Sequence, residues 1–484
     1  MIEKYIKIPV LGFSVIGLIF WIISCAVNPV TGKQELMLLS ESEEIDLGRQ
    51  TDAEIVKEYG VLEDPKLTAY LNDFCQRLGK VSHRPQLSYH FRVVDASVVN
   101  AFAVPGGYVY FSRGILATLN NEAELAGVMG HEIGHIAARH SAKQYSRAQL
   151  AQVGLGVGSF INIPILSGLA QLGAGMLFLR FTRDNEREAD DLGVEYASKA
   201  GYDSAQLASF FETLEQMNPG SDRSGLPGWF STHPSPQDRV QVVRDRAKEW
   251  QGKLRLRDSK INHEAYLRRI DGLLFGDDPR QGYVDGNVFY HPGMRFQFPV
   301  PTKWRLSHKS SQVLMVSEGE DALMLLSATS GASSSEAARE FITKTGASVI
   351  RSDGIRVNGL SSQRVTSEVR AQKAAYRLMS YFIEKGKSVF VFHGLTTVEG
   401  FQNYGPLFES TMRQFKELSD PRRIDVKPDR IRIRASRGSG TFDNAIRSLN
   451  VPNENLKEMA LLNGRNLSQI IPANTLVKVV EKGN

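Results

Sequence analysis

Apolar and polar positions between residues 41 and 274 repeat mainly with the period of an α-helix. The spacing predicts helices over residues 41–59, 65–81, 121–141, 182–199, 203–217 and 261–274. Two short apolar runs, 91–94 and 107–111, predict strands on either side of a Pro/Gly break at 104–107. The first half of the chain is therefore expected to be mainly helical, with a small sheet.

The pattern changes to alternation with a period of two from residue 288 onward. It predicts strands over 288–298, 313–317, 324–328, 363–369, 376–384 and 388–395, and helices over 335–345 and 403–418. After a charged stretch at 420–430 comes a small unit, predicted as a strand at 431–435, two short helices and a strand at 475–480. The patterns together predict an α+β chain of several domains.

The first residues have the features of an export signal. Lys4 and Lys7 precede an uncharged apolar run, 8–23, that ends at Ser24 and Cys25. A short apolar core behind a basic start is typical of a secretory signal peptide, here 1–24. The alternative is an uncleaved anchor helix. Both place the rest of the chain outside the cytoplasm.

Residues 22–25 also resemble a bacterial lipobox. The resemblance implies cleavage before Cys25 and lipidation of its thiol, with acyl chains that hold the protein on a membrane. Ala26 rather than Asp follows the cysteine, which resembles a sorting signal for the outer membrane. The expected location is therefore the periplasmic face of the outer membrane in the cell envelope.

Composition narrows the possible functions. The 484 residues carry 58 Lys and Arg against 53 Asp and Glu, a net charge of +5 spread over a long chain, which argues against a nucleic-acid binder. Hydrophobic residues at 42% and charged residues at 23% are ordinary for folded domains. Two cysteines, Cys25 and Cys75, are too few for a disulfide scaffold or a Cys-only zinc site. Cys75 lies on the apolar stripe of a predicted helix and is expected to be buried.

The strongest chemical signal is the run from His131 to His135, which reads His-Glu-Ile-Gly-His. Two histidines four positions apart lie one turn apart on a helix, so both imidazoles can reach one Zn²⁺ ion. Glu132 stands beside the first ligand and can take a proton from water at the metal. The alternative is a set of polar residues on a solvated helix face.

A third ligand is expected from the charged helix over 182–199. Glu186 and Asp190 are four positions apart, hence on one face, so Glu186 can bind zinc while Asp190 accepts a hydrogen bond from a ligand histidine. Glu188 lies about 200° around the helix from Glu186 and is expected to face elsewhere. An exposed charged helix is the alternative. His140, five residues after His135, is expected to be structural.

These motifs resemble the gluzincin family of zinc-dependent endopeptidases related to CAAX prenyl proteases, HtpX and BepA, over roughly 36–249. The resemblance implies a mainly helical catalytic domain with a small edge sheet and one Zn²⁺ per chain. It places beside the cleft a segment that can pair with an extended substrate, namely Asn100, Ala101, Phe102 and Ala103. The alternative for that segment is a plain turn between strands.

The resemblance also places His233 and Arg239 over the metal. His233 could donate to the oxyanion of the tetrahedral intermediate, or could occupy the fourth zinc position and make the enzyme latent. Arg239 is a candidate partner of the oxyanion or of Glu186. The uncharged stretch 150–179 has two interpretations, apolar helices packing on the zinc helix or a lid or membrane-interface segment.

Two further resemblances concern the second half. Residues 286–418 resemble the PsbP/Mog-like α+β fold, and 431–480 resemble a LysM module, which has the order βααβ and commonly binds N-acetylglucosamine chains in murein. The expected division is a signal peptide (1–24), a zinc metallopeptidase domain (25–255), a helical linker (256–283), a PsbP/Mog-like domain (284–419) and a LysM-like domain (428–484).

The leading hypothesis is a zinc endopeptidase that acts on envelope proteins, in quality control of misfolded or misassembled outer-membrane proteins. The alternative is a latent binding or assembly factor tethered to the membrane and to peptidoglycan. A third possibility, a murein hydrolase, depends only on the LysM resemblance. The expected partners are unfolded protein substrates, the membrane through Cys25, and peptidoglycan, without nucleic acid.

Overall fold

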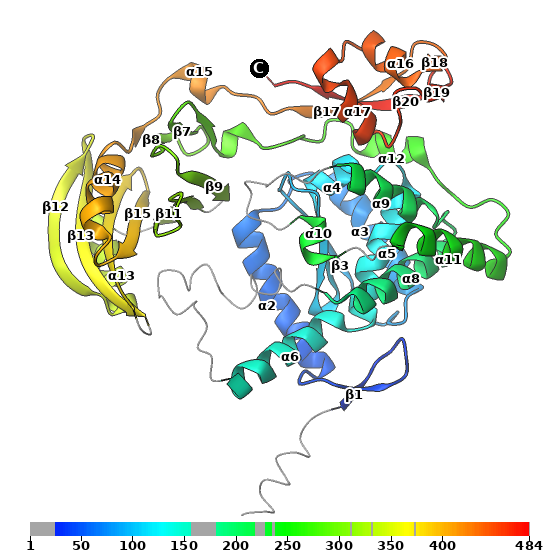
Figure 1. Cartoon of the computed structure of the whole chain (residues 1–484), viewed down its shortest axis with the longest axis horizontal. Coiled ribbons are helices and arrows are strands. Elements are labelled where there is room, and N and C mark those ends of the chain that lie inside the picture. The colour runs from blue at the N-terminus through cyan, green and yellow to red at the C-terminus, as the bar shows by residue number, and fades with distance from the viewer. Residues whose placement is uncertain are drawn as a thin grey trace, which may run out of the picture.

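The structure is a computed structural model that describes residues 25–155, 181–217, 228–234, 238–309, 312–330, 333–371 and 374–483. Figure 1 shows a helical part, a sheet-rich part beside it, and a small C-terminal unit over the helical part. The chain is thus a multidomain α+β protein, as the sequence predicts. The predicted signal peptide and most of the uncharged stretch 150–179 lie outside the described residues.

Within the described ranges, every helix is too short or too polar to cross a lipid bilayer.

The helical part surrounds one central helix, α5, which contacts α3, α8 and α9. Its helices are α2 (Glu41–Tyr59), α3 (Pro65–Lys80), α4 (Arg113–Thr118), α5 (Glu122–Ala137), α6 (His140–Leu155), α8 (Arg183–Lys199), α9 (Gln206–Gln216), α10 (Trp229–Thr232) and α11 (Arg239–Leu254). A mixed sheet of β3 (His90–Val94), β5 (Tyr108–Ser112) and β4 (Ala101–Val104) lies beside them, with β4 at one edge. Before them, β1 (Cys25–Val27) pairs with β2 (Gln34–Leu36).

Side-chain caps explain where the two central helices begin. The Asn121 side chain accepts from the backbone N–H of Glu124 at the start of α5. Thr182 and Asn185 form a reciprocal capping box at the start of α8. All residues of α5 are buried, so tertiary packing rather than an amphipathic pattern stabilises this helix.

Glycines let α5 and α8 approach closely. A Cβ at Gly130 would lie 3.0 Å from the carbonyl oxygen of Gly193, and a Cβ at Gly193 would lie 3.0 Å from the carbonyl oxygen of Gly127. Larger side chains at these positions would force the helices apart, because the core is close-packed. This close contact brings the face of α5 that carries His131 against the face of α8 that carries Glu186.

The sheet-rich part contains two antiparallel sheets. One has the order β12 (Ser348–Val357), β13 (Leu360–Ala371), β14 (Ala374–Lys385), β15 (Ser388–Thr397), β11 (Ala322–Ser330), β10 (Gln312–Val316) and β9 (Arg305–Lys309). The other has the order β16 (Lys416–Glu417), β8 (Phe296–Pro299), β7 (Val288–His291) and β6 (Tyr283–Asp285). Helices α13 (Ser334–Thr345) and α14 (Phe401–Arg413) pack on the larger sheet.

Three elements predicted between residues 261 and 418 have the wrong boundaries. The expected strand 288–298 is a hairpin of β7 and β8, because Pro292 and Gly293 interrupt it. The expected helix 403–418 ends at Arg413, and the residues after it form β16 against β8. The expected helix 261–274 is only α12 (His263–Arg269), so most of the segment predicted as a helical linker is irregular.

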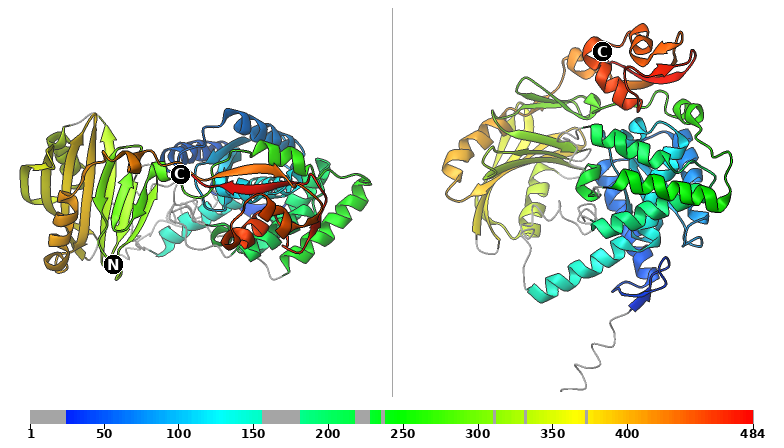
Figure 2. Two further views of the ribbon diagram at one scale, coloured as in Figure 1. Left: turned by 90° about the horizontal axis from the view of Figure 1, so that it is seen from above. Right: turned by 45° about the vertical axis from the view of Figure 1, so that its right-hand side comes forward.

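The C-terminal unit has the order β17 (Arg430–Ala435), α16 (Phe442–Ser448), α17 (Leu456–Leu462) and β20 (Leu476–Glu481), with β17 paired to β20. A short pair, β18 (Gly440–Thr441) and β19 (Ile470–Ile471), lies between them, and α15 (Pro421–Ile424) lies in the preceding linker. Figure 2 shows this unit against the helical part in both views. Its buried residues belong to the same hydrophobic cluster as those of α5.

A buried lysine joins this unit to the helical part. The ammonium of Lys478 donates to the carbonyl oxygens of Ala117, Thr118 and Leu119, at 2.7, 3.1 and 3.0 Å, where α4 ends. Burial lowers the pKa of Lys478 and raises that of the nearby Glu124, and the attraction between the two groups opposes both shifts. A buried cation with these partners fixes the position of β20 on the end of α4.

We expect Lys478→Met to lower the free energy of unfolding by about 3 kcal/mol, because it removes the donor that serves the carbonyl oxygens of Ala117, Thr118 and Leu119 and the cation that offsets the charge of Glu124. Urea denaturation measures the change, and hydrogen exchange of α17 reports whether the unit separates. Lys482→Met, at an exposed lysine that pairs with Asp429, is the matched control. Equal stability of the two variants would contradict this role for Lys478.

Candidate metal centre

Two imidazoles of α5 form the base of the site. His131 and His135 are fully buried, and their Nε2 atoms lie 3.0 Å apart. The helical spacing of four residues turns both rings to the same side, as the sequence predicts.

A carboxylate from α8 and a histidine that follows α10 complete the cluster. Glu186 Oε1 lies 3.4 Å from His135 Nε2, and Glu186 Oε2 lies 3.7 Å from His131 Nε2. One ligand atom from each of His131, His135, Glu186 and His233 falls within 4.8 Å of the others. Three nitrogens and one carboxylate oxygen that converge without exposure to solvent are the donors that Zn²⁺ prefers, so the residues fit a divalent cation.

The polar environment of Glu186 favours its ionised form. Burial alone would raise the pKa of Glu186, but His233, His135 and His131 outweigh that effect and hold the pKa well below its usual value. The carboxylate is therefore negative, as a metal ligand must be.

Asp190 fixes the orientation of His131. Asp190 Oδ1 lies 2.9 Å from His131 Nδ1, and a carboxylate can only accept, so Nδ1 carries the proton and the lone pair of Nε2 faces the cluster. The guanidinium of Arg239 donates to both oxygens of Asp190, at 2.7 and 2.8 Å, and to Glu186 at 3.3 Å. Arg239 therefore contacts the carboxylates of α8.

His135 is held by a second chain of polar residues. His140 Nδ1 lies 3.0 Å from His135 Nδ1, and His140 Nε2 lies 3.0 Å from Glu188 Oε2. Since Glu188 can only accept, a neutral His140 carries its proton on Nε2 and accepts from His135 Nδ1–H. Burial lowers the pKa of His140 despite the opposing effect of Glu188, which agrees with the neutral form. Glu188 points away from the cluster, but His140 contacts a candidate ligand.

Glu132 and His233 face each other across the centre. Glu132 is fully buried, and neither of its carboxyl oxygens has a hydrogen-bond partner among the described residues. Burial raises its pKa, against the effect of the nearby His233. His233 Nε2 lies 3.6 Å from Glu132 Oε1, and His233 Nδ1 lies 3.0 Å from Glu186 Oε1. The Trp229 ring stacks on His233 with centroids 4.4 Å apart.

The predicted substrate segment lies along the metal-binding helix. Ala101, Phe102 and Ala103 belong to β4, which packs on α5 and pairs with β5 on one side only. The backbone of Asn100 exchanges hydrogen bonds with Ser112, just before this edge strand. Cys25 begins β1.

Sequence reasoning missed the residues that support the ligands. The angular positions of His140 and Glu188 on their helices do not indicate a role at the metal centre, and the sequence pattern does not single out Trp229 or Phe181. The Phe181 ring stacks on His135 with centroids 4.0 Å apart. The sequence offers one signal: Trp229 stands four residues before His233. In the structure it begins the short helix α10, which ends just before this histidine.

Residues 65–247 match the family model described as Peptidase family M48. Three curated relatives are the "Beta-barrel assembly-enhancing protease" of Escherichia coli K12 (29% identity; 46% of this chain, 47% of the relative), the "Putative beta-barrel assembly-enhancing protease" of Vibrio cholerae (32%; 39% and 41%), and the "Metalloendopeptidase OMA1, mitochondrial" of Bos taurus (30%; 48% and 48%). The chain thus spans about half the length of these relatives.

Among solved structures, the cyanobacterial PsbP of Synechocystis aligns with 28% of this chain and 96% of its own, at 11% identity and a TM-score of 0.25. Yeast Mog1p aligns with 28% of this chain and 97% of its own, at 9% identity and a TM-score of 0.22.

We expect His140→Phe to weaken Zn²⁺ binding roughly 10- to 100-fold, because it keeps an aromatic ring but removes the acceptor that orients His135. Competition with a chromophoric chelator measures the affinity. His140→Gln, which keeps an acceptor, should restore part of it, and Asp191→Asn on the outer face of α8 is the control. Unchanged affinity in the phenylalanine variant would rule out an orienting role.

Proposed function

We propose that the chain is a zinc-dependent endopeptidase that cleaves proteins of the bacterial cell envelope, and that residues 65–247, which match the model of Peptidase family M48, are its metallopeptidase domain. The observation that carries the proposal is the convergence of His131, His135 and Glu186 from two helices, with Glu132 beside them. A murein hydrolase is less well supported, because the three ligands and the adjacent glutamate match the requirements of peptide-bond hydrolysis.

His131, His135 and Glu186 would hold the Zn²⁺ ion. Zinc bound there supplies a Lewis acid that polarises the scissile carbonyl and lowers the pKa of water. Glu132 takes the proton of the attacking water and passes it to the leaving amine. Because its carboxyl oxygens have no other hydrogen-bond partner among the described residues, they are available to a water molecule.

Arg239 and His233 both contact Glu186 and have different roles. Arg239 is engaged by Asp190 and Glu186, so we assign it to positioning these two carboxylates rather than to the oxyanion. His233 lies close enough to the ligand atoms of the cluster to serve as a fourth donor. We propose that His233 closes the centre at rest, and that its displacement opens the position that a substrate needs.

An extended substrate would pair with the edge strand β4, through residues 100–103. Main-chain hydrogen bonds of an added strand align a peptide without reading its sequence, which suits an enzyme for unfolded chains. The contact between β4 and α5 supports this, since a strand added there would pass beside the metal-binding helix.

The proposed substrates are misfolded or misassembled outer-membrane proteins, by analogy with the names of the relatives from Escherichia coli and Vibrio cholerae. We propose a lipid anchor at Cys25 and a position on the periplasmic side of the outer membrane. The expected domains (25–255, 284–419 and 428–484, with a linker at 256–283) remain our proposed division. We propose the PsbP/Mog-like and LysM-like folds for the last two, with peptidoglycan as a possible partner of the LysM-like domain.

A latent binding or assembly factor is the second candidate function. The position of His233 among the candidate ligands favours it, because a closed metal centre does not turn over substrate. The two candidates differ in whether His233 can be displaced.

We expect Glu132→Gln to lower the cleavage rate of casein by a factor of about 10² to 10⁴, with zinc content unchanged, because the variant loses its proton acceptor but keeps the ligands. Metal analysis and a fluorescent casein assay measure the two quantities. Glu215→Gln, at an exposed position on α9, serves as the control. Retained cleavage in the Glu132 variant would reject the mechanism.

We expect His233→Ala to raise the casein cleavage rate several-fold and to weaken zinc binding, because a fourth donor is removed. The same assays on His90→Ala, at an exposed histidine of β3, provide the comparison. A lower rate with unchanged zinc affinity would instead assign His233 to the oxyanion. Absence of cleavage in both wild type and His233→Ala would favour the assembly factor.

A further inference from the structure

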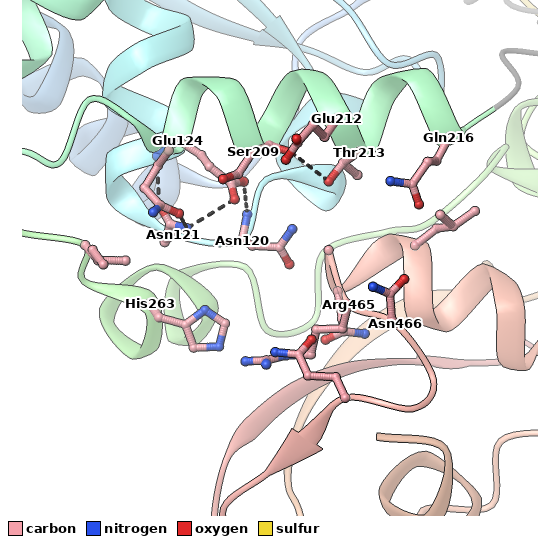
Figure 3. Close-up of a pocket in the computed structure, with 16 residues that line it drawn as sticks. Asn120, Asn121, Glu124, Ser209, Glu212, Thr213, Gln216, His263, Arg465 and Asn466 are labelled. Carbon is pink, nitrogen blue, oxygen red and sulfur yellow. Dashed lines mark hydrogen bonds between the residues drawn. The ribbon is translucent and has the colours of Figure 1, made fainter. Parts of the chain in front are cut away.

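A polar pocket lies where the C-terminal unit meets the helical part. It has a volume of about 430 Å³, within the range of about 300–1,000 Å³ typical of small-ligand pockets. Figure 3 shows it between α9, the start of α5 and the loop that follows α17. All but three of its lining residues are polar or charged. The metal centre and the pocket are separate, although both use α5.

One wall presents a buried acceptor without a donor. Asn120 is 5% exposed, and its Nδ2 donates to the carbonyl oxygen of Thr118 at 3.0 Å. Its Oδ1 has no hydrogen-bond partner among the described residues. A buried amide oxygen left unpaired costs free energy, so a ligand that brings an N–H or O–H group would stabilise this wall.

The opposite wall presents a cation without an anion. Arg465 is half-buried, and neither an ion pair nor a side-chain hydrogen bond of its guanidinium is found in the described part of the chain. Burial lowers the pKa of Arg465 without an acid to oppose the effect. An anion that accepts from this guanidinium would relieve the cost of its burial.

The backbone of the C-terminal loop approaches Asn120 closely. Gly464 has φ +57°, and a Cβ at this position would lie 3.1 Å from Asn120 Nδ2. Arg465 follows Gly464 directly, so this approach of the loop places Arg465 at the pocket, across from Asn120, as Figure 3 shows.

The two acids that line the pocket already have partners. Glu124 accepts from the Asn120 backbone at 2.7 Å and from the Asn121 side chain at 3.1 Å, and Lys478 opposes its charge. Glu212 accepts from Arg244 at 2.7 Å. The uncompensated charge at the pocket is therefore the positive charge of Arg465, which favours an anionic ligand.

The rest of the lining favours a polypeptide main chain over a sugar. Gln216, Asn466 and Gln469 add amide groups that both donate and accept, which match the N–H and C=O groups of a peptide. Among the described lining residues none is Phe, Tyr or Trp, the flat apolar surfaces that would cover the apolar face of a pyranose ring.

We propose that this pocket binds the free carboxyl terminus of an extended polypeptide. Arg465 binds the α-carboxylate, the Oδ1 of Asn120 accepts from a main-chain N–H, and Leu461 and Ile261 contact the last side chain. The site anchors a chain end roughly 10 Å along α5 from His131, since Glu124 precedes His131 by two turns.

Binding is tested on the full chain carrying Glu132→Gln, so that a cleavage step does not enter the measurement. The probes are fluorescein-labelled peptides with one Gly/Ser-rich stem, each ending in a different residue, and the same peptides with an amidated end. Fluorescence anisotropy should show saturable binding of at least one free-carboxylate peptide. Its amidated counterpart should bind at least tenfold more weakly, because the charge-assisted hydrogen bond is lost.

Arg465→Gln should weaken binding of the carboxylate peptide at least tenfold, and among the described residues it removes no hydrogen bond or ion pair of the guanidinium. Arg437→Gln removes a charge from another exposed loop of the same unit and should leave binding unchanged. Ser209→Leu, which narrows the pocket from α9, should also weaken binding.

Three results would overturn the proposal: no saturable binding of any carboxylate peptide, equal binding of the amidated peptides, or no effect of Arg465→Gln. Arg465-dependent binding of an N-acetylglucosamine oligomer, without binding of the peptides, would replace it with a glycan site. Because the assay uses a variant with the proton acceptor removed, its outcome is independent of the proposed peptidase activity.

Discussion

The close contact of α5 with α8 is the constraint on which the metal centre depends. Gly130 on one helix and Gly193 on the other leave room for backbone against backbone. At this separation the carboxylate of Glu186 reaches within 3.4 Å of His135 Nε2. Close-packed helices are not easily deformed, so the glycines fix the distance between ligands that are far apart in the sequence.

Buried hydrogen-bond chains then decide what these ligands can do. Arg239 and Asp190 hold His131 on one side, and Glu188 and His140 hold His135 on the other. Each chain ends in a group that can only donate or only accept, so the proton on each imidazole is placed away from the cluster. The low polarity of the surroundings strengthens both chains and makes an unpaired member costly.

The C-terminal unit is part of the same packed core as the metal-binding helix, because its buried apolar side chains and those of α5 form one cluster. Lys478 adds a directional contact to this packing by donating to the end of α4. One end of α5 therefore borders the C-terminal unit while the other carries the ligands. A ligand in the pocket between these parts would contact the helix that positions the metal, which gives the proposed chain-end site a physical connection to the centre.

The sequence by itself determined the local features. The spacing of His131 and His135 places both rings on one side of a helix, and the spacing of Glu186 and Asp190 does the same on another, because the helical period is a local property. Only the tertiary structure decided that His140 supports His135, that residues 288–298 fold back as a hairpin, and that Lys478 is buried against α4. These outcomes depend on contacts between segments that are distant along the chain. Neither the periodicity nor the residue type indicates which partner a buried polar group contacts.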